Sequence, residues 1–330
     1  NHRLAHVDPQ HRPTLCHALR EMGQQVARPS PKVCHRLSLG NFDGVHLGHR
    51  CVLDQVKRKG QELKLPTVAI IFEPQPQEFF AGEHAPRRLT RFSEKVRLLA
   101  AEGIDRVLCL SFNNRLRSMS ADAFVEQLLL QGLDVKHFVV GDDFRFGCDR
   151  SGDYNMLARV GKQHGFTVAH TATYEIEGER VSSSRIRQVL MKNALAEAES
   201  LLGRPYAISG RVVIGQQLGR QLGVPTANVR MHRYPSPLTG VYAVTATLAD
   251  GRHVNGICNI GMRPTVNGSF PVLEAHLFDL NENLYGSLLH IEFRHFIRAE
   301  QRFDGLDQLK KQIFTDIDEA RAYFAARPEE

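Results

Sequence analysis

The chain of 330 residues lacks tryptophan, long apolar runs and closely spaced cysteine pairs. A membrane-spanning helix needs about 20 consecutive apolar residues, whereas the strongest apolar stretch covers only residues 68–72. The cysteines are Cys16, Cys34, Cys51, Cys109, Cys148 and Cys258. Without a CxxC pair they predict neither a zinc site nor a disulfide framework. Scattered thiols, and a start without the apolar segment of a signal peptide, predict a cytoplasmic protein.

The overall composition is that of an ordinary globular protein. Hydrophobic residues make up 42% of the chain and charged residues 24%, which excludes a disordered or collagen-like protein. A chain of this length predicts two domains. Lys and Arg number 42 against 36 Asp and Glu, a net charge of +6. This excess favours anionic partners, either phosphates or nucleic acid, without choosing between them.

Beyond residue 32 the hydrophobic pattern alternates between strands and helices. Strands alternating with helices predict an α/β domain with a parallel, Rossmann-like sheet, whose ligands lie beyond the carboxyl ends of the strands. The predicted strands are 33–39, 67–72, 106–110, 135–140 and 166–171. The predicted helices are 46–59, 93–101, a helix capped by Ser120, 153–164, 183–191 and 194–202. Residues 1–31, rich in histidine and proline, are interpreted as a divergent extension rather than a metal site.

The pattern changes after residue 203. Strands without intervening helices predict an antiparallel barrel of five or six strands. Apolar residues three or four apart between Leu306 and Phe324 predict a terminal helix that packs on this barrel. The predicted strands are 206–214, 241–249, 253–260, 272–279 and 288–296. We therefore expect one domain at 32–203 and a second at 204–330.

The sharpest motif, GNFDGVHLGH at 40–49, follows a predicted strand and opens a helix. Gly40 and Gly44 permit unusual backbone angles and close approach by a ligand. The positive N-terminus of the helix suits a phosphate. His46 and His49 share one helical face, from which two imidazoles could donate hydrogen bonds to a polyphosphate. The alternative is a tight turn with two surface histidines. The remaining candidates here are Asn41, Phe42 and Gly48, the last leaving room for a nucleotide.

A second candidate phosphate site is SSSRIR at 182–187, at the start of a predicted helix. Hydroxyl and N–H groups at a helix N-terminus can bind phosphate, and Arg187 can add paired hydrogen bonds. The alternative is an ordinary serine cap with solvated arginines. The hydroxyls concerned belong to Ser182, Ser183 and Ser184.

The loop GDDFRFG at 141–147 also follows a predicted strand. Phe144 and Phe146 could stack on a flat ring, while Asp142 and Asp143 could accept hydrogen bonds. The alternative is a loop that is simply anchored in the core.

In the second domain, a glycine-rich loop precedes the sequence PTAN at 225–228. Such a loop can expose backbone N–H groups to phosphates. Pro225 stiffens its exit, and Thr226 and Asn228 present two oxygens on one side of an extended segment. These hard ligands suit Mg²⁺ on a nucleotide, although a flexible loop before an edge strand is the alternative. The glycines are Gly215, Gly219 and Gly223.

The motifs together carry a family resemblance. HxGH near the start and an SSTxIR-type motif, here with Ser184 in place of threonine, resemble those of nucleotidyltransferases. With FEPQP at 72–76, GDDFRFG, PTAN and LEAHLF at 273–278, the chain resembles the bacterial bifunctional riboflavin kinase/FMN adenylyltransferases, or FAD synthetases, over roughly residues 33–325.

This resemblance implies two ATP-dependent reactions. The barrel domain would phosphorylate riboflavin to FMN, with Glu274 as general base and Mg²⁺ held by Thr226 and Asn228. The α/β domain would adenylylate FMN to FAD and pyrophosphate, with His46 and His49 stabilising the phosphates. The same family pattern implies that Asn41, Ser183 and Arg187 hold the triphosphate and that the loop 141–147 seats the flavin. We expect the two nucleotide pockets at the rim of the sheet and at the mouth of the barrel.

Two other functions are compatible with parts of the sequence. An adenylyltransferase for another phosphate would not need the barrel or its PTAN motif. A basic barrel that binds RNA would need aromatic residues interleaved with Lys and Arg, whereas Tyr242, Phe278 and Phe293 are scattered. We therefore expect small-molecule partners, namely riboflavin, FMN, FAD and ATP, and neither nucleic acid nor a membrane. The sequence does not determine whether the chain forms oligomers.

Overall fold

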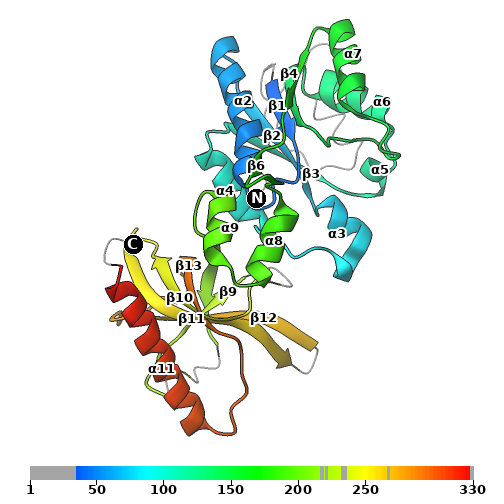
Figure 1. Ribbon diagram of the computed structural model, residues 1–330. Coiled ribbons are helices and arrows are strands. Elements are labelled where there is room, and N and C mark those ends of the chain that lie inside the picture. Colours follow the sequence, from blue (N-terminus) through cyan, green and yellow to red (C-terminus); the bar gives the residue numbers. More distant parts are fainter. Residues whose placement is uncertain (1–34, 216–218, 220–221, 232–235, 266–267, 328–330) are drawn as a thin grey trace. The chain divides into compact units, whose positions relative to one another are not determined.

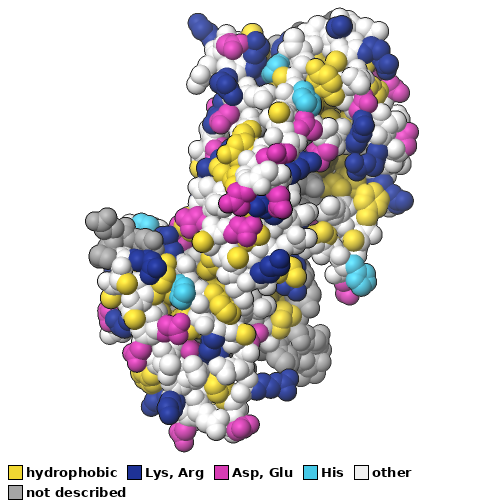
Figure 2. All heavy atoms as spheres, in the orientation of Figure 1, with side chains coloured by type: hydrophobic (Ala, Val, Ile, Leu, Met, Phe, Trp, Pro, Cys, Tyr) yellow, Lys and Arg dark blue, Asp and Glu magenta, His cyan; other side chains and the backbone are white. Residues whose placement is uncertain are grey.

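The computed structural model describes residues 35–215, 219, 222–231, 236–265 and 268–327, so the expected extension at 1–31 lies outside it. The chain forms two compact units (Figure 1), the first comprising 1–86 and 92–181 and the second 87–91 and 182–330. The expected domain boundary near residue 203 stays a prediction. Within the described residues, no helix combines the length and apolarity needed to cross a bilayer. Figure 2 shows basic and acidic side chains interspersed over the face in view.

The first unit is built on a five-stranded, fully parallel sheet with strand order β3-β2-β1-β4-β5. This confirms the predicted α/β fold. Alternate residues of the inner strand β2 enter two different cores, Ile70 on one face of the sheet and Ile71 on the other. The strands are β1 (His35–Leu39), β2 (Thr67–Glu73), β3 (Arg106–Ser111), β4 (Val135–Gly141) and β5 (Thr167–Thr171).

Helices cover both faces of this sheet. Leu53 and Leu99, from α2 and α4, pack on one face, and Leu128 and Leu157, from η2 and α7, pack on the other. Ser120 accepts a hydrogen bond from the amide of the third residue after it, as predicted for a helix cap. The helices are α2 (Leu47–Leu63), α3 (Pro76–Ala81), η1 (Gly82–His84), α4 (Phe92–Ala101), α5 (Asn114–Arg117), α6 (Ala121–Ala123), the π-helix η2 (Phe124–Gly132) and α7 (Tyr154–His164). A short hairpin, β6 (Glu175–Ile176) and β7 (Glu179–Arg180), precedes the second unit.

The strand order places two predicted site loops side by side. β1 pairs with β4, and the segments 40–49 and 141–147 begin at the carboxyl ends of these two strands. In an open parallel sheet, this point, where the strand order reverses, is where ligands bind.

The second unit contains a closed, six-stranded antiparallel barrel with order β10-β11-β12-β9-β8-β13, which confirms the predicted barrel. The short strand β9 was not predicted. The strands are β8 (Ala207–Val213), β9 (Ala227–Arg230), β10 (Gly240–Thr247), β11 (His253–Thr265), β12 (Gly268–Leu277) and β13 (Leu288–Arg298). Two helices, α8 (Ser183–Met191) and α9 (Leu195–Leu202), precede the barrel, and α11 (Leu306–Ala325) follows it.

Helix α11 packs on the outer wall of the barrel, as its apolar spacing predicts. Ile317 and Ala320 join Val241 and Ala243 of β10 in one core cluster. Because side chains alternate along a strand, Tyr242 between those two β10 residues is turned away from α11 and is fully buried. The barrel interior and the helix-covered wall are therefore separate cores.

A buried ion pair fastens α11 to the end of β13. Asp316 accepts from Nε of Arg298 at 2.9 Å and from a terminal nitrogen at 2.8 Å. The Asp316 residue is only 2% exposed. Gln312 donates a further hydrogen bond of 2.8 Å to the same carboxylate.

We expect Asp316→Ala to lower the free energy of unfolding of the second unit by about 2–3 kcal/mol, because it leaves a partly buried guanidinium without its counter-charge. Urea unfolding followed by circular dichroism measures this loss. The matched control is Arg252→Ala, which removes an exposed ion pair with Glu282 and is expected to change stability little. Equal effects of the two substitutions would contradict this role of Asp316.

Candidate functional site

The two histidines of HxGH cap helix α2 reciprocally. Nδ1 of His46 accepts from the amide of His49 at 3.3 Å, and Nδ1 of His49 accepts from the amide of His46 at 3.4 Å. The two rings stack with centroids 3.7 Å apart, which places them together as their spacing predicts. Because each Nδ1 acts as an acceptor, each neutral ring carries its proton on Nε2. The cap therefore sets the tautomer that presents an Nε2–H donor.

The turn before this helix is held in a strained conformation. Phe42, Gly44 and Val45 have φ values of 45°, 84° and 41°, in the left-handed region, which is costly for the two residues that carry bulky side chains. Both of those side chains are buried in the core between the sheet and α2. The expected positive angle is present at Gly44, but Gly40 has no positive φ. Burial of the Phe42 side chain in this core therefore stabilises the strained turn.

Gly48 lies against protein atoms. A Cβ at this position would be 3.1 Å from the carbonyl oxygen of Val181 and 3.2 Å from the His46 ring. Its small size allows the His46 ring and the segment just before Ser182 to pack tightly on α2. That this glycine also leaves room for a nucleotide stays a prediction.

The acidic residues of the loop 141–147 bind other parts of the first unit. Asp142 accepts a 2.5 Å hydrogen bond from the hydroxyl of Thr173, which lowers the pKa of its carboxyl, and it pairs with His170. Asp143 forms a 2.9 Å ion pair with Arg180. Both carboxylates thus tie the loop to the segment that ends the first unit.

The two aromatic residues of this loop differ in accessibility. Phe146 is 6% exposed and exchanges two 3.0 Å backbone hydrogen bonds with Gly152, so it anchors the loop in the core. Phe144 is half-buried and stacks on Phe146 with centroids 5.5 Å apart. Of the two, Phe144 is the one with surface left for a flat ligand.

An aromatic group that was not predicted from the sequence lies by the ends of β2 and β3. Phe79 and Phe80 of α3 both contact Phe112, with ring centroids 5.3 Å and 5.8 Å apart. Phe80 is 62% exposed, and the Arg117 guanidinium lies 5.5 Å from its ring. The signal in the sequence was QEFF directly after FEPQP.

The SSSRIR segment belongs to the second unit and is described within it. The hydroxyl of Ser182 accepts from the amide of Arg185 at 3.2 Å, so this serine is the helix cap. Arg187 is 9% exposed and donates from Nε to the carbonyl of Arg87 at 2.6 Å. The segment 87–91 thus orients this arginine. Ser183 is half-buried and Ser184 is exposed.

A row of polar side chains crosses three neighbouring barrel strands. Glu274 of β12 pairs directly with Asn228 of β9 on one side and Asn259 of β11 on the other. Asn259 in turn pairs with Val241, which packs with α11. Directly paired residues lie on the same face of a sheet, so this row lies on the outer wall of the barrel.

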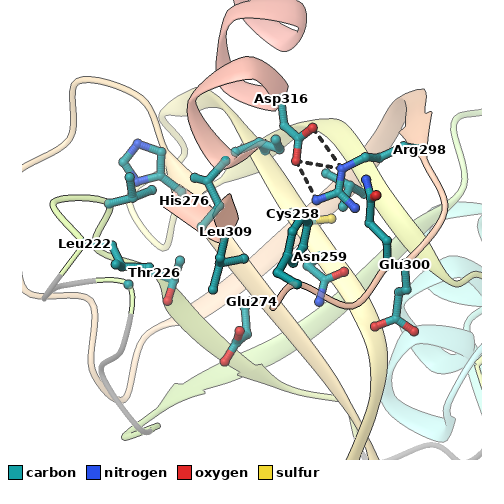
Figure 3. Close-up of a pocket in the computed structure, with 17 residues that line it drawn as sticks. Leu222, Thr226, Cys258, Asn259, Glu274, His276, Arg298, Glu300, Leu309 and Asp316 are labelled. Carbon is teal, nitrogen blue, oxygen red and sulfur yellow. Dashed lines mark hydrogen bonds and ion pairs between the residues drawn. The ribbon is translucent and has the colours of Figure 1, made fainter. Parts of the chain in front are cut away.

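A cavity of about 240 Å³ opens on this wall (Figure 3). In the view, Thr226 and Glu274 point toward the same edge, and Leu309 of α11 lies above them. The expectation that the pocket lies at the mouth of the barrel is wrong, because the strand register places Glu274 on the outer wall. The cavity is lined by Gly219, Leu222, Val224, Thr226, Val241, Ile257, Cys258, Asn259, Glu274, His276, Arg298, Glu300, Gln301, Phe303, Leu309, Ile313 and Asp316.

Two described glycines of the loop before PTAN approach polar side chains of that motif closely. A Cβ on Gly215 would overlap the amide of Asn228, and one on Gly219 would lie 3.2 Å from the hydroxyl of Thr226. Gly223 has a φ of 83°, which glycine adopts at no steric cost. Residues 216–218 and 220–221 of this loop lie outside the described residues.

Comparison with known proteins matches both units. Residues 30–185 match the family model described as FAD synthetase, and residues 202–324 match the model described as riboflavin kinase. Proteins named bifunctional riboflavin kinase/FMN adenylyltransferase are similar in sequence. The one from Haemophilus influenzae is 45% identical over 87% of this chain and 94% of its own, and the one from Escherichia coli K12 is 49% identical over 87% and 92%.

A solved structure shares the fold. A crystal structure described as Macrolide-efflux Protein from Streptococcus pneumoniae has a TM-score of 0.73 and 29% identity, and covers 86% of this chain and 92% of its own. Fold and matches together define a class of proteins that join a nucleotidyltransferase-like α/β sheet to a riboflavin kinase-like barrel. The chain belongs to the bifunctional riboflavin kinase/FMN adenylyltransferase family.

We expect Gly215→Ala to lower kcat/KM for riboflavin phosphorylation by about 100-fold, because the new methyl group displaces the Asn228 amide from its place beside Glu274. Formation of FMN by the purified variant measures this. The matched control is Gly305→Ala, since a Cβ there meets no atom within 4 Å. If Gly215→Ala were as active as the control, the close fit of Gly215 and Asn228 would have no role in the site.

Proposed function

We propose that this chain makes FAD from riboflavin in two ATP-dependent steps, each in its own site. The barrel cavity carries the phosphorylation of riboflavin, and the loops beyond β1 and β4 carry the adenylylation of FMN. The single observation that supports this most is the cavity lined by Thr226, Asn259 and Glu274, of which Glu274 also pairs with Asn228, together with the family membership of both units. That membership disfavours an adenylyltransferase for an unrelated phosphate.

In the first step, the 5′-hydroxyl of the ribityl chain attacks the γ-phosphorus of ATP. Glu274 takes the hydroxyl proton as the new O–P bond forms and the bond to ADP breaks. The apolar side chains of Leu309 and Ile313 from α11, and of Val241 from the barrel wall, line the cavity and suit the flat isoalloxazine ring. Positioning of the hydroxyl between the phosphate and Glu274 supplies much of the catalysis.

We propose that Mg²⁺ accompanies the nucleotide in this step. The Thr226 hydroxyl and the Asn228 amide are hard oxygen donors, and Glu274 lies beside Asn228. A set with so few protein donors fits Mg²⁺, which is usually bound by one or two protein groups together with substrate phosphates and water. When bound, the ion neutralises the charge of the phosphates.

In the second step, a phosphate oxygen of FMN attacks the α-phosphorus of a second ATP, and pyrophosphate leaves. The capping geometry supports a role for His46 and His49, because Nε2–H donors from both stacked rings can stabilise negative charge that develops on the phosphates. Asn41 and Gly44 of the turn hold the triphosphate in this proposal, while the role of Ser183 and Arg187 stays a prediction from the family pattern. Phe144 and the exposed ring of Phe80 provide flat surfaces for the flavin.

The division of labour follows the two matched segments. We propose that residues 32–203 carry the adenylylation and residues 204–330 the phosphorylation, and that the chain works in the cytoplasm on small molecules alone. Incubation of the purified chain with riboflavin, ATP and Mg²⁺, followed by chromatography of the flavins, tests the proposal directly. FMN should appear first and FAD second. Absence of both products would contradict it.

We expect His46→Asn to reduce FAD formation by a factor of about 10²–10³, or about 3–4 kcal/mol of transition-state stabilisation. Asparagine keeps an acceptor that can cap α2 but lacks the Nε2–H. Formation of FMN from riboflavin should stay unchanged and serves as the control for folding. His46→Ala should lose FAD formation in the same way, and full FAD synthesis by His46→Asn would contradict the role of this imidazole.

We expect Glu274→Gln to show the reverse pattern. The amide cannot accept the ribityl proton as a base, so FMN formation should fall by a factor of about 10²–10⁴. FAD formation from supplied FMN should persist, and separate assays with riboflavin and with FMN measure the two activities. Loss of both activities in a folded variant would contradict the assignment of two separate sites.

A further inference from the structure

The side chain of His276 holds the backbone of the PTAN motif. Its Nδ1 lies 2.8 Å from the carbonyl oxygen of Pro225. A carbonyl oxygen can only accept a hydrogen bond, so Nδ1 carries the proton and donates it. We infer that His276 is a positioning residue for riboflavin phosphorylation, which acts by fixing the peptide plane from which Thr226 projects. The inference rests on the proposed role of Thr226 at the phosphates.

The sheet itself does not hold Thr226. The ladder between β9 and β12 ends at the pair Ala227 and Ala275, so Thr226 lies one residue beyond it. Pro225, the next residue out, has no amide hydrogen with which a ladder could continue. The His276 side chain instead holds this residue through its carbonyl, which immediately precedes Thr226.

Thr226 is also confined on its other side. The place that a Cβ on Gly219 would occupy lies 3.2 Å from the threonine hydroxyl. The hydroxyl thus lies between a glycine that lets the loop approach and a peptide plane fixed by His276. Both His276 and Thr226 line the cavity, and Figure 3 shows them at the same side of it.

Strand β12 thereby carries both the proposed base and the residue that fixes the phosphate-binding group. Glu274 and His276 are two residues apart on β12 and face the same side. The first bears the proposed base, and the second fixes the group proposed to hold the phosphates. The spacing of the two residues along the strand therefore helps to set the distance between the proposed base and the group proposed to hold the phosphates.

The hydrogen bond makes a distinctive prediction about pH. Nδ1–H is present both in this neutral tautomer and in the imidazolium ion, so the donor persists whichever form is present. The hydrogen bond from His276 to Pro225 is therefore expected to form whichever protonation form is present. Substitution should change the rate and leave the shape of its pH profile unchanged.

Three purified variants test the inference. His276→Asn places an amide donor where Nδ1 lies, whereas His276→Leu has no donor. His253→Leu is the matched control, since that barrel histidine binds the hydroxyl of Thr247 at 3.2 Å and does not line the cavity. Riboflavin phosphorylation and FMN adenylylation are measured for each. Hydrogen–deuterium exchange of the peptide 222–231 is measured without nucleotide or metal.

We expect His276→Leu to lower kcat/KM for ATP in riboflavin phosphorylation by about tenfold or more, with the KM for riboflavin and the rate of FMN adenylylation unchanged. The peptide 222–231 should exchange faster in this variant. His276→Asn should restore the rate and the slow exchange, and His253→Leu should match the unmodified chain in both.

Two results would overturn the inference. One is His276→Leu with full kinase activity, and the other is His276→Asn as impaired as His276→Leu, which would assign the effect to the ring and not to the hydrogen bond. Thr226→Ala separates these failures from failure of the proposed function. If Thr226→Ala phosphorylates riboflavin normally, the proposed role of that residue is wrong. If it is inactive while His276→Leu is fully active, only the inference about His276 is wrong.

Discussion

The alternation of side chains along β12 is the constraint on which the kinase site depends. It turns Glu274 toward Asn228 and Asn259 on the neighbouring strands, and toward the wall that α11 covers. A slip of one residue in the register would turn the whole row into the barrel interior, where Tyr242 and other apolar side chains already fill the space. The packing of the interior therefore fixes the register, and the register fixes the site. Helix α11 completes the cavity because its apolar stripe covers the same outer wall.

In the first unit, a strained turn and a helix cap position the proposed site. Its sheet brings the segments after β1 and β4 together, and burial of Phe42 and Val45 holds the strained turn between strand and helix. The reciprocal cap then fixes how the two imidazoles are protonated and how they face. Structural and proposed chemical roles coincide here, since the Nδ1 atoms that cap the N-terminus of α2 also direct the Nε2–H groups. Gly48 also helps to place the His46 ring, because the absence of a side chain allows that ring to pack on α2.

Much of this architecture was predictable from the sequence, for identifiable reasons. Strong hydrophobic periodicity gave the parallel sheet, the barrel and α11, and Ser120 marked its helix correctly. Short elements such as β9, α3 and α5 were missed, because four to six residues carry too little pattern. The position of the cavity was also missed, since which face of a barrel strand turns outward depends on pairing with strands distant in sequence. The same holds for the aromatic group around Phe80, and for the burial of Phe146 by Gly152.

A structure of the chain with riboflavin and the magnesium complex of ADP tests the central claim most directly. The flavin ring should lie between the outer barrel wall and α11, with the terminal ribityl hydroxyl within hydrogen-bond distance of Glu274 and the ADP phosphates beside Thr226. A flavin bound in another part of the second unit, or Glu274 directed into the barrel interior, would contradict it.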